Sequence, residues 1–576
     1  MRDGGSTLGS SPFRMGAWLP GGLAWLGLVL SLVLLYLRLS AEDPSIVWRV
    51  WLSSDTLYPV NVFTDVFHDG YGISGWRFSI APCWFPDLVA TGLFLALTGN
   101  VVLATLLAGF IQIVALVLLF KAFRVALGLP RQGAMGPILL LVAVLLTIFV
   151  ANHAGLTDVD VFQLFLPQSH VGSVCVALGG LALGIAIARR EGEGRSAGWT
   201  MVGGYVVLCV LGGMSNLLFL PNALVPLTIV AVAFVLLRLM PRRAGALLLL
   251  GWPAAVVGIF LNRTLFRVTD LAAQAGSSRA RIRTALVVFT RGFFSNLLSG
   301  EPLHLAAVLW AVVCLVVGWL ALRSALASRS EDQRRTQSLA AMLFLCLFLS
   351  SAAGCAAIVL GGSNGLAVFK DYRWSMHYLH PTFLVPLFGL PAVGAWWLQR
   401  ARPRAVRWVG TASSVAACAL PVYALAGTKP PATLLQAQVP PMTQFMDELA
   451  AREHLRTGFA GYWQARPITL FSRTGLRAYA VDGSMTPLLW VSNLQWYQQL
   501  RRADGKGFDV DFVVLDDPLW KLSREAAVSV FGEPRREVRF GGTRVLIYGG
   551  RQEAPSPVPG PVPVEVPTEA RPVPSR

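Results

Sequence analysis

Charged residues are scarce in this chain, and their scarcity excludes several classes of protein. Asp, Glu, Lys and Arg make up 14% of the 576 residues, whereas a soluble globular protein carries about 25%. A small soluble enzyme, a disordered regulator and a disulfide-rich secreted module are therefore excluded. The 7 cysteines are scattered without a CxxC pair, which argues against a cysteine-based metal site and against a disulfide scaffold.

Nucleotide-binding and metalloprotease signatures are also missing. The chain has no Walker or Rossmann glycine motif, no HExxH and no internal repeat, so an ATP-driven pump has no support. The net charge of +17 does not indicate a nucleic-acid partner, because the basic residues lie between apolar runs. Basic residues in that position are better interpreted as determinants of membrane topology.

Apolar residues are abundant instead, and they predict a polytopic helical membrane protein. They make up 55% of the chain, with a mean hydropathy of +0.58. A helix needs about 20 apolar residues to cross a membrane. We expect eleven spans near residues 20–39, 100–120, 134–151, 170–188, 199–214, 218–237, 244–261, 304–322, 338–358, 381–398 and 408–426. The first follows a tail with Arg2 and Arg14 and is interpreted as a signal anchor.

The apolar segment 87–98 is too short for a span and suits a re-entrant or interfacial helix. If it does not cross, the basic clusters beside short loops all fall on the cytoplasmic face, as the positive-inside rule requires. These clusters lie within residues 121–131, 189–195, 238–243, 323–335 and 400–407. The N-terminus is then cytoplasmic and the C-terminus is outside.

This topology divides the chain into four parts. Residues 1–19 form a cytoplasmic tail and residues 20–426 a membrane domain, whose first outer loop is 40–99. Residues 427–550 are expected to form a small extracytoplasmic α/β domain, because PMTQFMDELAAREHL has a helical pattern and FDVDFVVLDD reads as a buried strand. Residues 551–576 are Pro-rich and too poor in apolar surface to fold.

The first outer loop combines acids with aromatic anchors. It contains Asp55, Asp65, His68, Asp69 and Asp87 among Trp48, Trp51, Trp76 and Trp84. Such a surface suits a site where a polar substrate meets a lipid-borne one. The alternative is structural: Asp55 caps a helix through 59–68, Asp87 caps the short apolar helix, and the others are solvated loop charges.

Three short motifs resemble the GT-C superfamily of polytopic glycosyltransferases, which use lipid-phosphate-linked sugars. An SD-x-x-YP element at 54–59 is followed by Gly-Trp at 75–76 and AP-x-x-FPD at 81–87. GYWQARPITLFS at 461–472 and WVSNLQWY at 490–497 look like segments of related bacterial proteins. The resemblance covers the general plan of nearly the whole chain.

The resemblance implies that an acid of the first outer loop is the general base, which carries Asp55 into that role, with Asp87 as second choice. An inverting transfer needs one carboxylate to deprotonate the acceptor hydroxyl. The expected substrate contacts in the same loop are Tyr58, Asp65, His68 and Trp76. Some relatives bind a divalent metal through such acids, but nothing in the spacing here requires a metal or other cofactor.

A lipid-phosphate donor also needs a cation site on the outer face. Within the second outer loop, 262–303, the stretch 262–294 carries six arginines against one acid, and Arg binds phosphate in a bidentate manner. Arg263, Arg267 and Arg291 are the candidates from this loop. Attraction of the whole cluster to anionic lipid headgroups explains it equally well.

The third outer loop adds Lys370, Arg373 and His377 before the tenth expected span. They resemble the phosphate-contacting region of the same superfamily, or they form a charged surface group with a histidine at the interface. His153 and His170 fit no familiar metal-ligand pattern and are interpreted as loop residues. A polar break at Ser215-Asn216 either bounds a lipid groove or is a tight turn.

Together these features predict a membrane glycosyltransferase that moves a sugar from a polyprenyl-phosphate donor to a glycan, lipid or protein acceptor. We expect it in a bacterial plasma membrane, in contact with membrane lipids and acting on the outer face in cell-envelope glycan biosynthesis. The alternatives are a transporter or flippase of lipid-linked glycans, and a non-catalytic scaffold. A transporter predicts charges inside the spans and inverted repeats, and neither is evident.

Overall fold

The computed structural model describes most of the chain in separate stretches. These are residues 52–79, 81–127, 170–268, 279–361, 439–502, 507–516 and 522–549, with residue 166 and short pieces within 26–30 and 364–419. The expected spans 20–39, 134–151, 381–398 and 408–426 lie wholly or largely outside the described residues, as do the two terminal tails.

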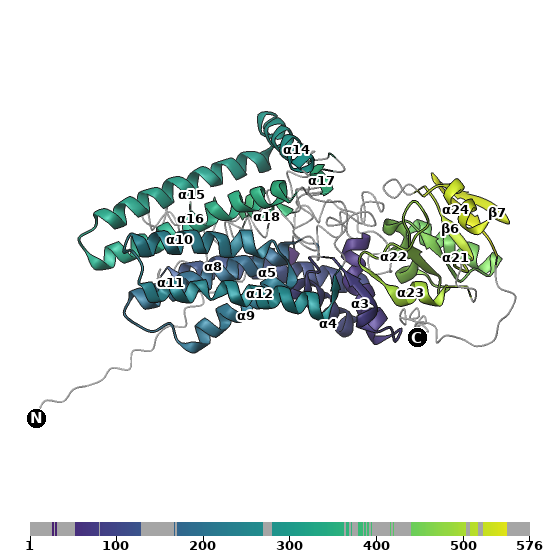
Figure 1. Ribbon diagram of the computed structural model, residues 1–576, viewed down its shortest axis with the longest axis horizontal. Helices are drawn as coiled ribbons and strands as arrows, with labels where there is room; N and C mark the ends of the chain where they lie inside the picture. Colours follow the sequence, from purple (N-terminus) through teal and green to yellow (C-terminus); the bar gives the residue numbers. More distant parts are fainter. Residues whose placement is uncertain are drawn as a thin grey trace, which may run out of the picture.

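Five helices are long and apolar enough to cross a membrane, as expected of a membrane protein. They run side by side in Figure 1. They are α5 (Val101–Ala126), α8 (Val171–Gly192), α11 with α12 (Arg242–Leu249 and Gly251–Leu265), α15 (Pro302–Ala327) and α16 (Glu331–Leu360). All five coincide with expected spans. The exposed side chains of α15 include Leu309, Val312 and Trp319, an apolar surface that suits contact with lipid.

Two shorter apolar helices coincide with two more expected spans. They are α9 (Trp199–Ser215) and the continuous pair η5 (Leu220–Leu224) and α10 (Val225–Leu236). Helix α9 packs closely on α12, because a Cβ at Gly213 would lie 2.3 Å from the carbonyl oxygen of Ala255. Small residues at such contacts bring membrane helices together. The total of about eleven spans stays a prediction.

The apolar segment 87–98 forms a helix that is shorter than the expected spans. After a π-helical turn, η3 (Trp84–Leu88), helix α4 covers Val89–Thr98 and ends at Gly99, whose φ of 61° is left-handed. Asn100 then caps α5, its side chain accepting from the Leu103 amide at 3.0 Å. Ten residues of helix span about 15 Å, half of the hydrocarbon core, and the expectation that this segment does not cross stays a prediction.

The basic short loops meet at one end of the helical bundle. Arg189 donates to the Val125 carbonyl, Arg334 donates to the Arg238 carbonyl, and Arg243 pairs with Glu191 at 3.4 Å. The C-terminal region lies at the opposite end (Figure 1). This arrangement agrees with the expectation that these basic clusters share one face of the membrane.

The first loop carries its own secondary structure at the other end of the bundle. Helix α3 covers Ser54–Phe67, followed by η2 (Ile73–Gly75) and strand β1 (Trp76–Phe78). The helix begins earlier than expected and Ser53 is its N-cap, with its hydroxyl accepting from the Thr56 amide. The prediction that Asp55 caps this helix was therefore wrong, and Asp55 lies in the first turn.

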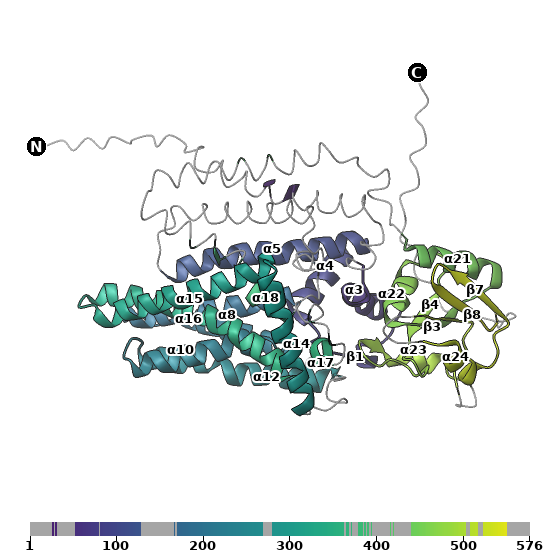
Figure 2. The same cartoon turned by 90° about the horizontal axis from the view of Figure 1, so that it is seen from above.

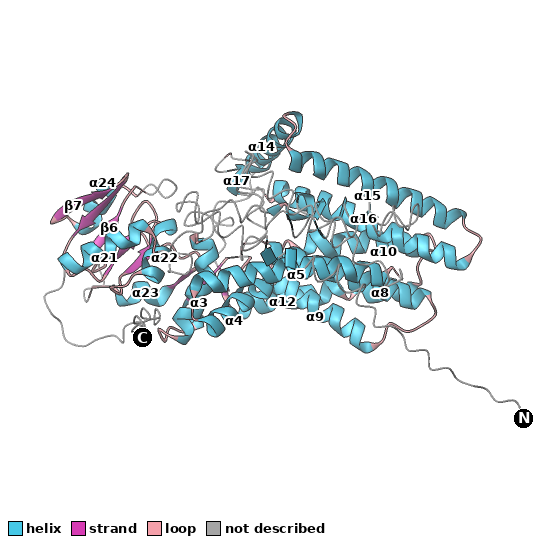
Figure 3. Ribbon diagram, turned by 180° about the vertical axis from the view of Figure 1, so that it is seen from behind, coloured by secondary structure: helices cyan, strands magenta, loops and turns pink. Residues whose placement is uncertain are grey.

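The C-terminal region is a mixed sheet covered by helices. Its strands are β3 (Thr457–Ala460), β4 (Arg477–Ala480), β6 (Phe512–Val514), β7 (Arg536–Phe540) and β8 (Thr543–Ile547), in the order β4-β3-β6-β8-β7. Its helices are α21 (Pro441–Glu453), α22 (Tyr462–Phe471), α23 (Leu494–Gln499) and α24 (Arg524–Phe531). The parallel pair β3 and β4 is joined through α22, a βαβ unit that places the start of α22 at the carboxyl end of β3. The remaining described elements are almost all helical (Figure 3).

A second, small sheet joins three distant parts of the sequence. Strand β1 of the first loop pairs in parallel with β2 (Arg267–Val268) and antiparallel with β5 (Ser492–Asn493), with Trp76 opposite Asn493. Figure 2 shows the first-loop helix α3 between the bundle and α22. The first loop therefore attaches the C-terminal region to the membrane helices.

Candidate functional site

The Asp55 carboxylate lies where α3 meets the C-terminal region. The Tyr462 hydroxyl donates a hydrogen bond of 2.5 Å to Asp55 Oδ1. Burial raises the pKa of the Asp55 carboxyl, whereas the Tyr462 hydrogen bond and the Arg466 charge lower it. Its place in the first turn of α3 also suits a negative charge, because the helix dipole is positive there.

Arg466 of α22 connects the first turn of α3 to the C-terminal region. Its guanidinium Nη1 donates to the Ser54 carbonyl at 2.6 Å and to the Tyr462 hydroxyl at 2.9 Å, and Nη2 donates to the Val491 carbonyl. The Ser54 hydroxyl donates back to the Tyr462 carbonyl at 2.5 Å. The SD-x-x-YP segment thus contacts the GYWQAR segment, more than 400 residues further along the chain, and Arg466 connects both to the WVSN segment.

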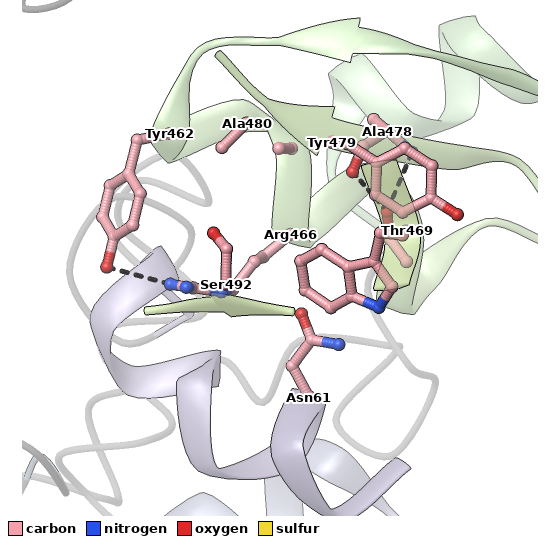
Figure 4. Close-up of a pocket in the computed structure, with 10 residues that line it drawn as sticks. Asn61, Tyr462, Arg466, Thr469, Ala478, Tyr479, Ala480 and Ser492 are labelled. Carbon is pink, nitrogen blue, oxygen red and sulfur yellow. Dashed lines mark hydrogen bonds between the residues drawn. The ribbon is translucent and has the colours of Figure 1, made fainter. Parts of the chain in front are cut away.

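A small cavity adjoins this network. Its volume is about 10 Å³, enough for about one water molecule, and Asn61, Arg466, Ser492 and Trp496 are among its lining residues (Figure 4). In the same view the Tyr462 hydroxyl points to Arg466. The polar groups around this cavity belong to both the first loop and the C-terminal region.

Tyr58 and Trp76 form the aromatic support of the site. Tyr58 follows Asp55 by one helical turn, and its ring centroid lies 5.9 Å from that of Trp76 and 5.8 Å from the Arg466 guanidinium carbon. Trp76 is fully buried and contacts Trp496 edge-on at 5.2 Å. Both side chains are buried in the described structure, and their expected contact with substrate stays a prediction.

Asp65 lies at the contact between the first loop and β5. It is fully buried and accepts hydrogen bonds from Asn493 Nδ2 at 3.0 Å and from Asn61 Nδ2 at 3.5 Å. Burial raises its pKa to about 8 despite the hydrogen bond from Asn493. His68, the C-cap residue of α3, is exposed. Asp69 lies just beyond and pairs with Arg477 at 2.6 Å.

Asp87 is buried between membrane helices. It is 1% exposed, and Gln112 of α5 donates to its Oδ1. A Cβ at Gly172 of α8 would lie 2.2 Å from its other oxygen, so only glycine leaves room for this carboxylate. No side chain caps the start of α4, and the structure therefore contradicts the prediction that Asp87 caps it.

Cys83, His170 and Asn216 form a buried polar group beside Asp87. His170 Nδ1 lies 2.7 Å from Asn216 Nδ2 and 3.7 Å from Cys83 Sγ. Cys83 and His170 have φ values of 52° and 67°, a left-handed conformation that non-glycine residues adopt at a cost and often at functional sites. His170 was interpreted as an ordinary loop residue, and its isolation in the sequence offered no signal of these contacts.

The polar break at Ser215-Asn216 binds the first loop. Ser215 Oγ accepts from the Phe85 amide and donates to the Phe85 carbonyl, both at 2.9 Å. Trp84 Nε1 donates to Asn262 Oδ1 at 3.2 Å. The AP-x-x-FPD element is therefore held by the ends of α9 and α12.

Both candidate acids act electrostatically on the Cys83 thiol. Burial raises the pKa of this thiol, and the charges of Asp87 and Asp55 raise it further. The third outer loop also lies close to Asp55 and His170. Its Tyr378 interacts electrostatically with Asp55, and the Tyr378 ring centroid lies 4.8 Å from that of His170. Burial raises the pKa of Tyr378 to about 12. The first loop, the third loop and the C-terminal region thus converge around Asp55.

Two of the predicted cationic residues line one cavity. Arg291, on α14 (Arg279–Leu298), and Lys370 border a space of about 410 Å³ together with Ser295, Asn296 and Tyr372. Gly292 permits this arrangement, because a Cβ there would lie 2.4 Å from the Tyr372 ring. A cation pair beside amide and hydroxyl groups suits a phosphate.

The other predicted cations are not placed in that cavity. Arg263 is exposed in the last turn of α12, and Arg267 lies in β2, opposite Arg77. Arg373 and His377 lie outside the described residues. Within the described stretches, no group of three or more His, Cys, Asp or Glu side chains has the arrangement of a metal site.

Comparison with models of known protein families, with curated proteins and with solved structures finds no match for this chain. The functional assignment therefore depends on the residues, their contacts and the resemblance of the motifs.

Proposed function

We propose that this protein is an inverting membrane glycosyltransferase of the GT-C type. It transfers a sugar from a polyprenyl-phosphate-linked donor to a glycan, lipid or protein acceptor on the outer face of a bacterial plasma membrane. The proposal includes about eleven spans, a cytoplasmic N-terminus and an extracytoplasmic C-terminal α/β domain. The observation that carries it is the position of Asp55, which lies at the junction of the three motif segments and the third loop.

Asp55 acts as the general base in this proposal. Its carboxylate takes the proton of the acceptor hydroxyl while the acceptor oxygen bonds to the anomeric carbon. The bond between that carbon and the phosphate oxygen breaks, and its electron pair leaves with polyprenyl phosphate. Tyr462 binds Oδ1, so we assign the proton transfer to Oδ2. The raised pKa of Asp55 supports this role, because burial makes the carboxylate a stronger base.

The cavity beside Arg291 and Lys370 supports the donor half of the proposal. A leaving phosphate needs cationic stabilisation more than it needs a general acid. Two cations from different outer segments border this cavity, and the exposed apolar side chains of α14, such as Phe294 and Leu298, suit contact with the lipid chain. Asp87 is the second candidate base, but its burial between α5 and α8 favours a structural role.

The test measures release of polyprenyl phosphate from a panel of polyprenyl-phosphate sugars by purified full-length protein in lipid, with a cell-envelope fraction as acceptor. We expect release by the wild type and none by Asp55→Asn. Asp332→Asn is the matched control, because this carboxylate is 93% exposed and lies on α16 among the basic loops.

Equal release by the wild type and Asp55→Asn would remove Asp55 from the chemistry and direct the search to Asp87. Absence of release from every donor, with an acceptor shown to be competent, would refute the transferase and favour a transporter of lipid-linked glycans. Vesicle uptake of the same donors would then identify it.

A further inference from the structure

Asp55 does not obtain its environment from the membrane domain alone. We propose that Tyr462 and Arg466 of α22 position the Asp55 carboxylate for proton transfer, so that the site is complete only when the C-terminal region is bound to the first loop. This inference rests on the proposed function. Neither side chain touches the reacting atoms, and both act through Asp55.

The Tyr462 side chain is held in one place by its surroundings. It is 1% exposed, and its ring packs against Trp463 at 5.1 Å and Trp490 at 4.9 Å between centroids. It is also the first residue of α22, one residue beyond the end of β3, so the sheet fixes the position of its backbone. The hydroxyl that reaches Asp55 is therefore preorganised.

Arg466 determines which way the Tyr462 hydroxyl proton points. The two residues are four apart and share one face of α22. Because Arg466 has only donors, its bond to Tyr462 uses a lone pair of the hydroxyl oxygen. The hydroxyl proton is then directed to Asp55 Oδ1, and the Ser54 carbonyl holds the guanidinium in this orientation.

Other contacts hold the C-terminal region on the first loop without involving Asp55. Strand β5 pairs with β1, Asn493 donates to Asp65, and Arg477 pairs with Asp69. Removing one hydroxyl at position 462 leaves all of these in place. Positioning of the base and attachment of the region can therefore be separated by experiment.

The positioning role predicts a particular kinetic change in Tyr462→Phe. The lost hydrogen bond lowers the pKa of Asp55 in the wild type, so its removal raises that pKa. The acid limb of the pH profile of kcat/KM should therefore move to higher pH. At neutral pH we expect kcat to fall by about tenfold or more, with little change in donor KM, because a hydrogen bond to a charged group has been removed. Arg466→Lys should move the limb in the same direction.

Tyr497→Phe is the matched control. Tyr497 is also a buried tyrosine of the C-terminal region, and its hydroxyl donates to the Ala480 carbonyl at 2.6 Å, away from Asp55. A purely structural loss would affect both tyrosine variants alike and leave the pH profile in place. Superimposable profiles for Tyr462→Phe, Arg466→Lys and the wild type would overturn the inference.

A second readout separates this inference from the proposed function. Carbodiimide modification of the Asp55 carboxyl, followed by peptide mass spectrometry of the full-length protein across pH, reports its protonation without any turnover. We expect the midpoint to rise in Tyr462→Phe and to stay unchanged in Tyr497→Phe. If the wild type releases no polyprenyl phosphate but this midpoint still rises, the transferase is refuted and the positioning contact stands. An unchanged midpoint in a transferase-active protein refutes the positioning role alone.

Discussion

Asp65 predicts an unusual dependence of stability on pH, and replacing it by asparagine should remove that dependence. Its carboxyl is fully buried where α3 meets β5, with Asp69 and the Arg477 charge nearby. Burial raises its pKa from an ordinary value of 3.8 to about 8. Asparagine has nearly the same shape, carries no charge at any pH and still offers an oxygen to the Asn493 amide.

The direction of the effect follows from proton binding. Between pH 3.8 and about 8 the folded protein keeps a proton on Asp65 that the unfolded chain has released. The free energy of unfolding therefore falls as the pH rises through this window. Above the window, the contribution of the Asp65 proton to stability is completely lost. Each pH unit corresponds to about 1.4 kcal/mol, so the last two units below the folded pKa remove about 3 kcal/mol.

The assay is the thermal unfolding midpoint of the full-length protein in lipid, followed by tryptophan fluorescence near pH 6 and again above pH 8. Trp76 and Trp496, whose ring centroids lie 5.2 Å apart, are beside this contact and contribute to the signal of the chain's 18 tryptophans. The wild-type midpoint should fall with rising pH, and that of Asp65→Asn should fall much less. Tyr497→Phe should lower the midpoint equally at both values. An Asp65→Asn protein that keeps the wild-type pH slope would refute the reasoning.

Three further predictions concern the cavity, the helix packing and the tail. Arg291→Gln and Lys370→Gln should each raise the donor KM by about tenfold with kcat nearly unchanged, as measured by steady-state release of polyprenyl phosphate. A decrease in kcat alone would contradict the phosphate site. Gly258→Ala should destabilise the protein by about 1–3 kcal/mol and lower its thermal midpoint, because the new Cβ would lie 2.1 Å from the Val210 carbonyl oxygen. Gly203→Ala is the control, because a Cβ at Gly203 would meet open space. Deleting residues 552–576 should leave turnover and melting unchanged, and lost activity would contradict the prediction of a disordered tail.

Local patterns were enough to place many elements. The five long apolar helices, the short helix α4 and the amphipathic α21 all lie where apolar runs and turn residues predicted them. A run of about 20 apolar residues has few alternatives to a membrane helix, because its backbone must bond internally in lipid. The described basic loops meet at one end of the bundle for a related reason, since charge is excluded from the hydrocarbon core.

Finer local predictions failed where two neighbouring side chains compete for one role. Ser53 and Asp55 are both good N-caps, and the backbone selected Ser53. Asp87 precedes a helix as a cap would, but the approach of Gln112 and Gly172 gives it another partner and another environment. Sequence position indicates which groups are available for a cap, whereas packing decides which one is used.

The sequence by itself determined that this is a helical membrane protein, where most of the described helices lie, and that an acidic first loop contains Asp55. Only the tertiary structure decided what surrounds that carboxylate. Tyr462 and Arg466 reach it from a helix more than 400 residues away, and His170 and Asn216 join the neighbouring polar group from two other helices. Hydrophobic periodicity is a local property, so it identifies elements. A buried charge, in contrast, needs hydrogen-bonding partners whose positions depend on how distant elements pack, and no local pattern records them.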